Sequence, residues 1–189
     1  MACAALPATA APLQAAAAAP AVAPGAGVFG DGAGEIGADF AFTWFDSDLT
    51  DARGNRYSLR GGRRFGPMLQ WEGEITRSTV SEDLLPGAEK RVTVAMALAN
   101  LIVNFHPREN VVPYLLAGIG VGQMKLEAIG LSSRETANAY QIAAGGRFFF
   151  GGRSRVAARI ELSLLANEGF DERYVHVTLG AGLTFSVGE

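Results

Sequence analysis

Few residues in this sequence could carry nucleophilic chemistry. Its two histidines are His106 and His176. Only His176 has a hydroxyl residue, Thr178, two positions away, and hydrolysis of this kind needs a nucleophile, a base and an orienting acid held together. A strand would point both side chains to the same interior face. We therefore predict that the protein is not an enzyme, that His176 is a hydrogen-bonded interior residue, and that His106 is solvated in a turn.

Metal and cofactor chemistry has equally little support. Four residues are spaced loosely like calcium ligands: Asp46, Asp48, Asp51 and Asn55. They lack the glycine and the terminal glutamate of an EF-hand loop, so we interpret them as a solvated acidic loop. The single cysteine, Cys3, excludes a cysteine-built zinc site. The net charge of −3 gives no reason to expect nucleic acid. We expect no metal and no cofactor.

Charged residues of opposite sign recur at alternating positions within apolar or glycine-rich segments. They form, with one histidine, the candidate site: Asp39, Arg60, Arg64, Glu72, Glu74, Arg147, Arg159, Glu161 and His176. The acidic and basic members balance, and a confined interior needs that balance because an unpaired charge away from water is costly. We predict a fixed interior network of ion pairs. An ion path or a gate is the alternative.

Strands are the elements that would position these side chains. From residue 35 to 185, apolar and polar residues alternate with period two between glycine-rich or polar breaks. Eight strands are expected, at residues 36–44, 57–65, 69–76, 91–105, 114–126, 138–150, 156–164 and 175–185. The alternation changes phase within 91–105. A bulge near Ala99 or Asn100 would place the apolar residues of both halves on one face, and a short buried helix is the alternative.

The composition of the two faces predicts what each one meets. The polar face is rich in glycine and alanine and almost free of lysine, which suits the crowded inside of a narrow barrel. On the apolar face, the candidate cation is Arg63, near a strand end. Aromatic residues on that face lie near strand ends, where interfacial girdles belong: Trp44, Tyr57, Phe65, Phe105, Tyr114, Phe148, Phe150 and Phe185. We predict an all-β fold, an eight-stranded antiparallel up-and-down transmembrane β-barrel with a polar, small-residue lumen and an apolar exterior. A soluble ligand-binding barrel with reversed faces is the alternative.

Connection lengths give independent support for a membrane barrel. Long polar joints are expected at 46–56, 78–90, 127–137 and 166–173. They alternate with short joints at 66–67, 106–111 and 151–154. Long extracellular loops and tight periplasmic turns alternate in this way in outer-membrane barrels. We divide the chain into an Ala/Pro-rich segment, 1–33, that is signal-derived or flexible, and a barrel domain, 34–189.

Three segments resemble a known family: Asn100-Leu-Ile-Val-Asn-Phe105, Val112-Pro-Tyr-Leu-Leu-Ala-Gly-Ile-Gly-Val121 and Leu179-Gly-Ala-Gly-Leu-Thr-Phe185. Over residues 34–185 the chain resembles the eight-stranded outer-membrane β-barrel domain family, which includes the OmpA transmembrane domain, OmpX and opacity-type surface proteins. The resemblance implies a place in the cell outer membrane, contact with its lipid and lipopolysaccharide, and contact with the insertion machinery during assembly.

The role that we expect is structural or adhesin-like, through four extracellular loops that could bind an extracellular ligand, because loops on a rigid scaffold often carry recognition residues. A narrow porin-like channel for ions or small solutes is the alternative. A lipid A-modifying enzyme is a third, less favoured one.

Overall fold

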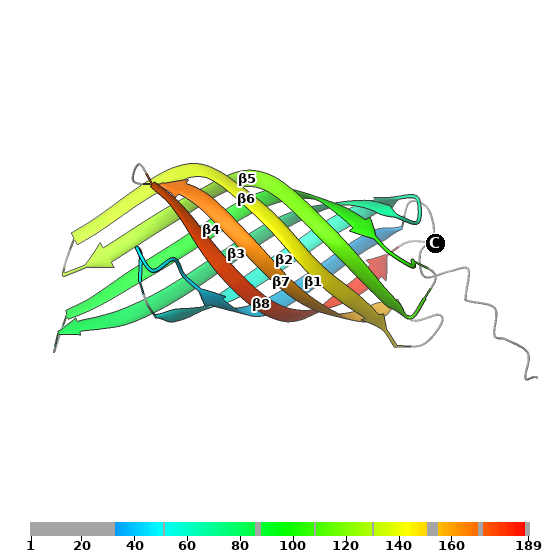
Figure 1. The fold of residues 1–189 in the computed structure, drawn as a ribbon, viewed down its shortest axis with the longest axis horizontal. Coiled ribbons are helices and arrows are strands. Elements are labelled where there is room, and N and C mark those ends of the chain that lie inside the picture. Colours follow the sequence, from blue (N-terminus) through cyan, green and yellow to red (C-terminus); the bar gives the residue numbers. More distant parts are fainter. Residues whose placement is uncertain are drawn as a thin grey trace, which may run out of the picture.

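Eight antiparallel strands close into a barrel in the computed structural model of the chain, which describes residues 33–50, 52–85, 88–107, 109–129, 131–150, 155–169 and 172–187. Each strand pairs with its neighbour in sequence, and the last closes against the first (Figure 1). The strands are β1 (Gly34–Trp44), β2 (Arg53–Phe65), β3 (Leu69–Leu85), β4 (Ala88–Asn104), β5 (Val111–Ala128), β6 (Leu131–Phe149), β7 (Val156–Gly169) and β8 (Glu172–Val187). The predicted fold class is confirmed.

The alternation of side chains gives the barrel an apolar exterior. On β7, Ile160 and Leu162 are 50% and 53% exposed, whereas the intervening Arg159 and Glu161 are 1% and 5% exposed. The same exposure of large apolar residues recurs on all eight strands. A soluble barrel would bury these residues, so this surface is suited to lipid.

Strand β4 differs from its predicted form. Its pairing with β3 and β5 runs without a register shift through Ala99 and Asn100, so the expected bulge is wrong, and so is the helix alternative. Because the phase is unbroken, Val92 and Met96 point into the lumen and are 1% and 4% exposed, while Leu101 points outward. The sequence pattern was misleading here because both faces of β4 are apolar.

The long joints of the predicted pattern are mostly strand. Strand β3 continues to Leu85 and β4 begins at Ala88, while β5 ends at Ala128 and β6 begins at Leu131. These extensions read as loops because their residues are polar on both faces, although the backbones pair as regular hairpins. A long connection does lie between β1 and β2, but short hairpins lie where the other three long loops were expected, so the predicted alternation of long and short connections is wrong (Figure 1).

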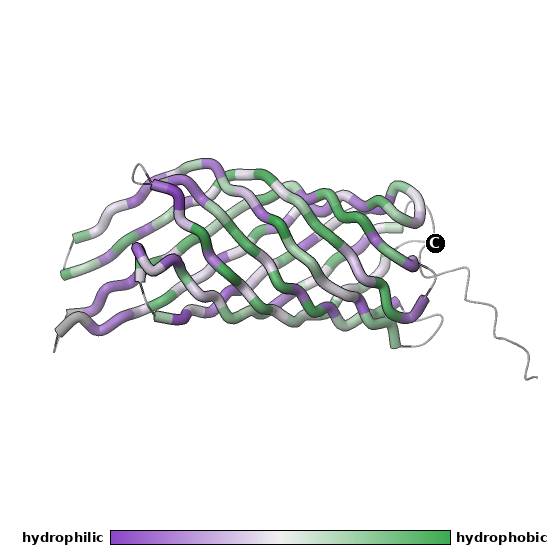
Figure 2. Tube along the Cα trace, in the orientation of Figure 1, coloured by the Kyte–Doolittle hydropathy of each residue, from purple (hydrophilic) through white to green (hydrophobic). Residues whose placement is uncertain are grey.

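The two ends of the barrel differ. Gly34 pairs with Val187 at one end, which we call the terminal end. At the other, the hairpin end, β3 extends beyond β2 and β6 extends beyond β7. We call this region the projecting sheet; it consists of residues 80–85, 88–92, 121–128 and 131–138. Hydrophilic residues gather toward this end, whereas hydrophobic and hydrophilic residues alternate along the middle of the barrel (Figure 2). Residues 131–138 of β6 pair with β5 and have no pairing with β7.

Within the part of the chain that the structure describes, no helix has the length and apolar character needed to span a bilayer.

Candidate functional site

The lumen of the barrel contains the charged residues of the candidate site. Asp39 comes from β1, Arg60 and Arg64 from β2, Glu72 and Glu74 from β3, Arg147 from β6, Arg159 and Glu161 from β7, and His176 from β8. All are buried except Asp39, which is intermediate, although its side chain is only 9% exposed. Six strands therefore direct these side chains toward one axis, as the period-two pattern predicts.

Two arginines organise the centre of the network. Arg159 lies 2.8 Å from Glu72 and 2.7 Å from Glu161, measured from guanidinium nitrogen to carboxylate oxygen. Arg60 lies 2.8 Å from Glu161 and 2.6 Å from Asp39. These pairs join β1, β2, β3 and β7 across the lumen. Because each guanidinium carries several donors in a fixed plane, one arginine can bind carboxylates from different strands.

A tyrosine that was expected outside completes this centre. Tyr114 is 1% exposed, and its hydroxyl accepts a hydrogen bond from Arg159 Nε and donates one to Glu161, both at 2.7 Å. The guanidinium carbons of Arg147 and Arg159 each lie 4.8 Å from the centre of its ring. The prediction of Tyr114 in the outer aromatic girdle is wrong, because the residue is in phase with the lumen-facing positions of β5.

Toward the terminal end, a second group of polar side chains fills the lumen. Glu35 pairs with Arg64, and its other oxygen lies 3.4 Å from Arg147 and 2.7 Å from the Gln70 amide nitrogen. Arg147 also donates a hydrogen bond of 2.5 Å to Asn104. Glu35 was not among the predicted site residues because the first strand was expected to begin at residue 36, although Glu35 is in phase with Asp39.

Toward the hairpin end, Arg56 closes the network. It pairs with Glu74 and donates hydrogen bonds of 3.1 Å to Ser163 and Thr178. The sequence analysis placed Arg56 in a loop, because β2 was expected to begin later. Among the described residues, the lumen network contains five arginines and five carboxylates, namely Arg56, Arg60, Arg64, Arg147, Arg159, Glu35, Asp39, Glu72, Glu74 and Glu161. The charges balance, as a low-dielectric interior requires.

An apolar cluster fills the lumen between this network and the hairpin end. We call it the apolar cluster; it consists of Phe45, Leu49, Val80, Val92, Val94, Met96, Leu98, Met124, Ala139, Leu165 and Tyr174. The residues of β4 in it were expected on the outer face. A cavity of about 10 Å³, close to the smallest space that can hold one water, is lined by Val94, Met96 and Leu165 of this cluster and by Thr43, Thr76 and Thr178.

His176 lies beside the apolar cluster and is 2% exposed. Its Nε2 is 3.0 Å from Asn167 Oδ1, and its Nδ1 accepts a long hydrogen bond of 3.4 Å from the backbone N–H of Asp46. The Thr178 hydroxyl instead bonds Arg56 and Ser163. His176 and Thr178 thus serve separate contacts and do not form a nucleophile and base pair.

The loop considered for calcium makes different contacts. The Asp46 carboxylate accepts hydrogen bonds from the backbone N–H groups of Val175, at 2.9 Å, and Asp48, at 3.2 Å. The Val175 bond holds the pKa of Asp46 below its usual value, against a smaller opposing effect of burial. Asp51 lies outside the described residues. No group of three or more possible metal ligands occurs within the described part of the chain.

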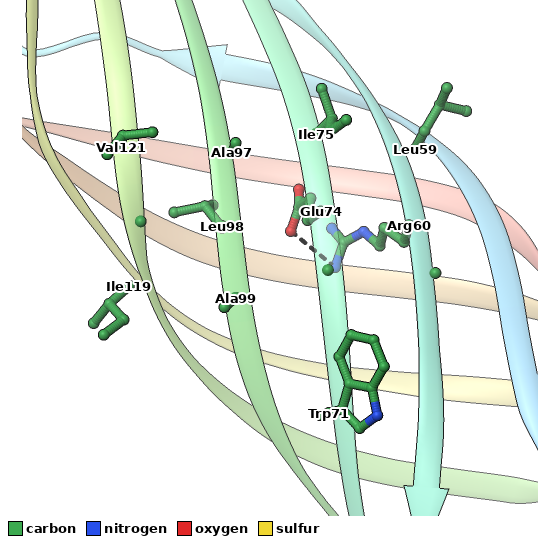
Figure 3. Close-up of a pocket in the computed structure, with 13 residues that line it drawn as sticks. Leu59, Arg60, Trp71, Glu74, Ile75, Ala97, Leu98, Ala99, Ile119 and Val121 are labelled. Carbon is green, nitrogen blue, oxygen red and sulfur yellow. Dashed lines mark ion pairs between the residues drawn. The ribbon is translucent and has the colours of Figure 1, made fainter.

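The exterior of β2, β3, β4 and β5 carries an apolar hollow of about 670 Å³. Its floor contains Gly61, Gly73 and Ala99, which pair in one row across the strands, and larger apolar side chains such as Leu59 and Trp71 surround them (Figure 3). Arg60 and Glu74, which form an ion pair of 3.4 Å, lie behind this wall in the lumen. The hollow and the charged network therefore share a wall but face different surroundings.

Comparison with known proteins decides between the membrane barrel and the soluble alternative. The model of a protein family described as outer membrane protein beta-barrel domain matches residues 1–185. The chain belongs to this family. Its place is the cell outer membrane, and the soluble-barrel alternative is wrong. Among curated proteins, none matches the chain.

Solved structures of outer-membrane proteins share the fold. Neisserial surface protein A is 19% identical, with a TM-score of 0.66 over 82% of this chain and 99% of that one. Ail, the attachment invasion locus protein of Yersinia pestis, solved with the heparin analogue sucrose octasulfate, is 19% identical, with a TM-score of 0.57 over 82% and 100%. OprG from Pseudomonas aeruginosa is 12% identical, with a TM-score of 0.51 over 86% and 100%. At these identities the likeness concerns the fold of this outer-membrane barrel.

Proposed function

We propose that this outer-membrane barrel is a non-enzymatic surface-interaction protein, that its hairpin end faces the cell exterior, and that its projecting sheet binds the partner. The observation that carries the proposal is the contrast between a filled lumen and a sheet that extends beyond the apolar band. An extended, rigid sheet presents side chains at fixed spacing, which is what a recognition surface requires. The hairpins thus take the role that the sequence analysis gave to four loops.

The filled lumen favours this role over the narrow channel. Arg60 and Arg159 span the cross-section through ion pairs, and the apolar cluster then blocks the way to the hairpin end. An eight-stranded barrel has an interior that its own side chains fill. We expect no steady opening above baseline in planar bilayers. A reproducible stepwise conductance would support the channel instead.

Cations on the outward face of the projecting sheet indicate an anionic partner. Lys125 and Arg134 pair directly across β5 and β6. Arg91 on β4 faces the same side two positions beyond Thr93, the residue of β4 that pairs with Lys125. Glu127 and Glu89 pair with Lys125 and Arg91, and Asp83, opposite Glu89, is a third carboxylate on this face, so an anion must compete with these acidic neighbours. These cations could bind the anionic groups of a sulfated or phosphorylated ligand. Ail, which is structurally similar, was solved with a sulfated ligand.

Sucrose octasulfate titrated by calorimetry into the protein in lipid nanodiscs tests this proposal. We expect binding that weakens as salt is raised and that falls about tenfold in the double variant K125Q/R134Q. R63Q is the matched control, because Arg63 is an exposed, outward arginine at the terminal end. Equal loss in R63Q, or binding unaffected by either change, would contradict a specific site on the projecting sheet.

A further inference from the structure

The connection between β1 and β2 enters the mouth of the barrel at its hairpin end. Phe45 and Leu49 are 8% and 7% exposed and belong to the apolar cluster inside the lumen. Both residues come from a connection and not from a strand, so their burial depends on how that connection folds. Connecting segments normally run over the surface. This one places two large apolar side chains inside.

The lumen provides a fitted space for Phe45. The ring centre of Phe45 lies 4.9 Å from that of His176. Gly54, on β2, supplies the room, because a Cβ at this position would come within 2.6 Å of the Phe45 ring and 2.5 Å of the Thr79 carbonyl oxygen. Any other residue at position 54 would displace the ring or the neighbouring strand. Glycine at this strand position is therefore explained by the close approach of both the β3 backbone and the Phe45 ring.

One carboxylate holds the connection in this position. Asp46 Oδ2 accepts the hydrogen bond from Val175 on β8, and Oδ1 accepts the one from Asp48 within the connection. The Asp46 carbonyl oxygen accepts hydrogen bonds from Leu49, at 3.0 Å, and Thr50, at 3.1 Å, which turns the chain so that Leu49 points inward. Asp46 thus links the turn to the barrel wall.

Two further hydrogen bonds to the connection come from the projecting sheet. The Thr50 hydroxyl donates a hydrogen bond of 2.8 Å to Glu82 on β3, and Lys90 on β4 donates one to the Leu49 carbonyl oxygen. The hydrogen bonds that hold the connection are few, whereas the part of the lumen that it covers is apolar and is lined by strands. The connection can therefore separate from the barrel without any strand pair being broken.

We propose that residues 45–50 form a latched stopper, which closes the hairpin-end mouth of the lumen and opens as a unit when the Asp46 latch is released. In the closed position Phe45 and Leu49 cover the apolar cluster. In the open position the cluster and the small cavity beneath it are accessible from the hairpin end. The stopper is independent of any partner bound by the outward cations.

Cysteine labelling measures the opening directly. L165C places a thiol in the apolar cluster beside His176, at a residue 3% exposed, and Cys3 is replaced by serine in every variant. The probe is a water-soluble maleimide added to the protein in nanodiscs. We expect slow labelling in the L165C background and an increase of about tenfold or more in D46N/L165C. The D46N change removes one acceptor and places an amide donor against a backbone donor.

D48N/L165C is the matched control. It removes the same charge two residues away, and the contact of Asp48 with the latch is made by its backbone nitrogen. We expect labelling within about twofold of the background, since an exposed charge of this kind contributes little. Equal rates in D46N and D48N would overturn the proposal. Labelling of L165C as fast as that of an exposed cysteine would overturn it as well.

A second variant covers the case in which D46N does not fold. Retention of the barrel is checked by the difference in gel mobility between unboiled and boiled samples. T50V/L165C removes the hydroxyl that bonds Glu82 while keeping the side-chain shape. We expect a several-fold increase in labelling, because the acceptor is a charged group. No increase in a folded T50V variant would contradict a stopper held by polar ties.

Discussion

The charged network and the apolar cluster fill the same lumen by different physical means. In the network, each side chain is held by partners on other strands, as Arg159 is by Glu72 and Glu161. In the cluster, residues such as Met96 and Met124 are held by shape and by exclusion of water. Removal of one charged partner leaves an opposite charge buried, whereas removal of an apolar group leaves only a cavity. The two regions should therefore respond to truncation with different severity.

The largest effect is expected for R159M. Glu72 and Glu161 would keep Arg60 but lose Arg159, which leaves one carboxylate charge unbalanced inside a water-poor lumen, so we expect the free energy of unfolding to fall by about 3–5 kcal/mol. Denaturant titration of the barrel in lipid vesicles, followed by gel mobility, measures this. R63M, at an exposed arginine on the outer face of β2, should change the free energy of unfolding by less than about 0.5 kcal/mol. A loss below about 1 kcal/mol in R159M would contradict the expectation that the charged network is more sensitive to truncation than the apolar cluster.

A smaller loss is expected for M96A in the apolar cluster. Met96 is 4% exposed, and its truncation leaves a cavity. We expect the free energy of unfolding, measured by the same titration, to fall by about 2–3 kcal/mol. V121A, on the neighbouring strand but facing lipid with 55% exposure, is the control and should lose less than about 1 kcal/mol. Were M96A to destabilise more than R159M, packing and not ion pairing would dominate lumen stability.

Y114F tests how far the network depends on a single hydroxyl. The ring and its contacts with two arginines remain, while the bonds to Arg159 and Glu161 are lost. We expect a loss of about 1–2 kcal/mol, since a buried acceptor loses its partner. Y140F removes the hydroxyl of a 40% exposed tyrosine and should be nearly neutral. Equal small changes in both would mean that the tyrosine acts through its ring alone.

The smallest effect is expected for the pH dependence of the Asp46 contacts, which hold the connection over the apolar cluster. The folded pKa of Asp46 is lowered, mainly by the Val175 N–H, so the latch contributes its stability above the unfolded pKa of about 3.9 and loses it as the pH falls through the folded pKa. Glu82, Glu172, Tyr174, His176 and Lys90 face the same connection. The accessibility of L165C, read with a thiol reagent that reacts in acid, should be flat from pH 7 to about 5 and rise below about 4. The D46N variant should show a smaller rise, and any rise that remains is assigned to His176, whose Nδ1 accepts the hydrogen bond of the residue 46 N–H.

The same contrast explains what the sequence could predict. On β7, charged and apolar residues alternate, so the faces of Arg159 and Leu162 could be assigned correctly. On β4, Val92 and Leu101 point to opposite sides yet are equally apolar, and period alone cannot tell a lumen-filling residue from a lipid-facing one. The apolar cluster was missed for that reason. Arg56 was missed because strand ends beyond the apolar band look like loops, and the inward fold of Phe45 depends on tertiary contacts that no local pattern records.

The ion pairs that cross the lumen also constrain how the barrel assembles. Arg60 on β2 binds Asp39 on β1 and Glu161 on β7, residues far apart in the chain, and Arg56 reaches both β7 and β8. A partly formed sheet inside lipid would hold these charges without their partners, at high cost. We therefore expect charge neutralisation and closure of β1 against β8 to coincide, so that insertion is a single cooperative event.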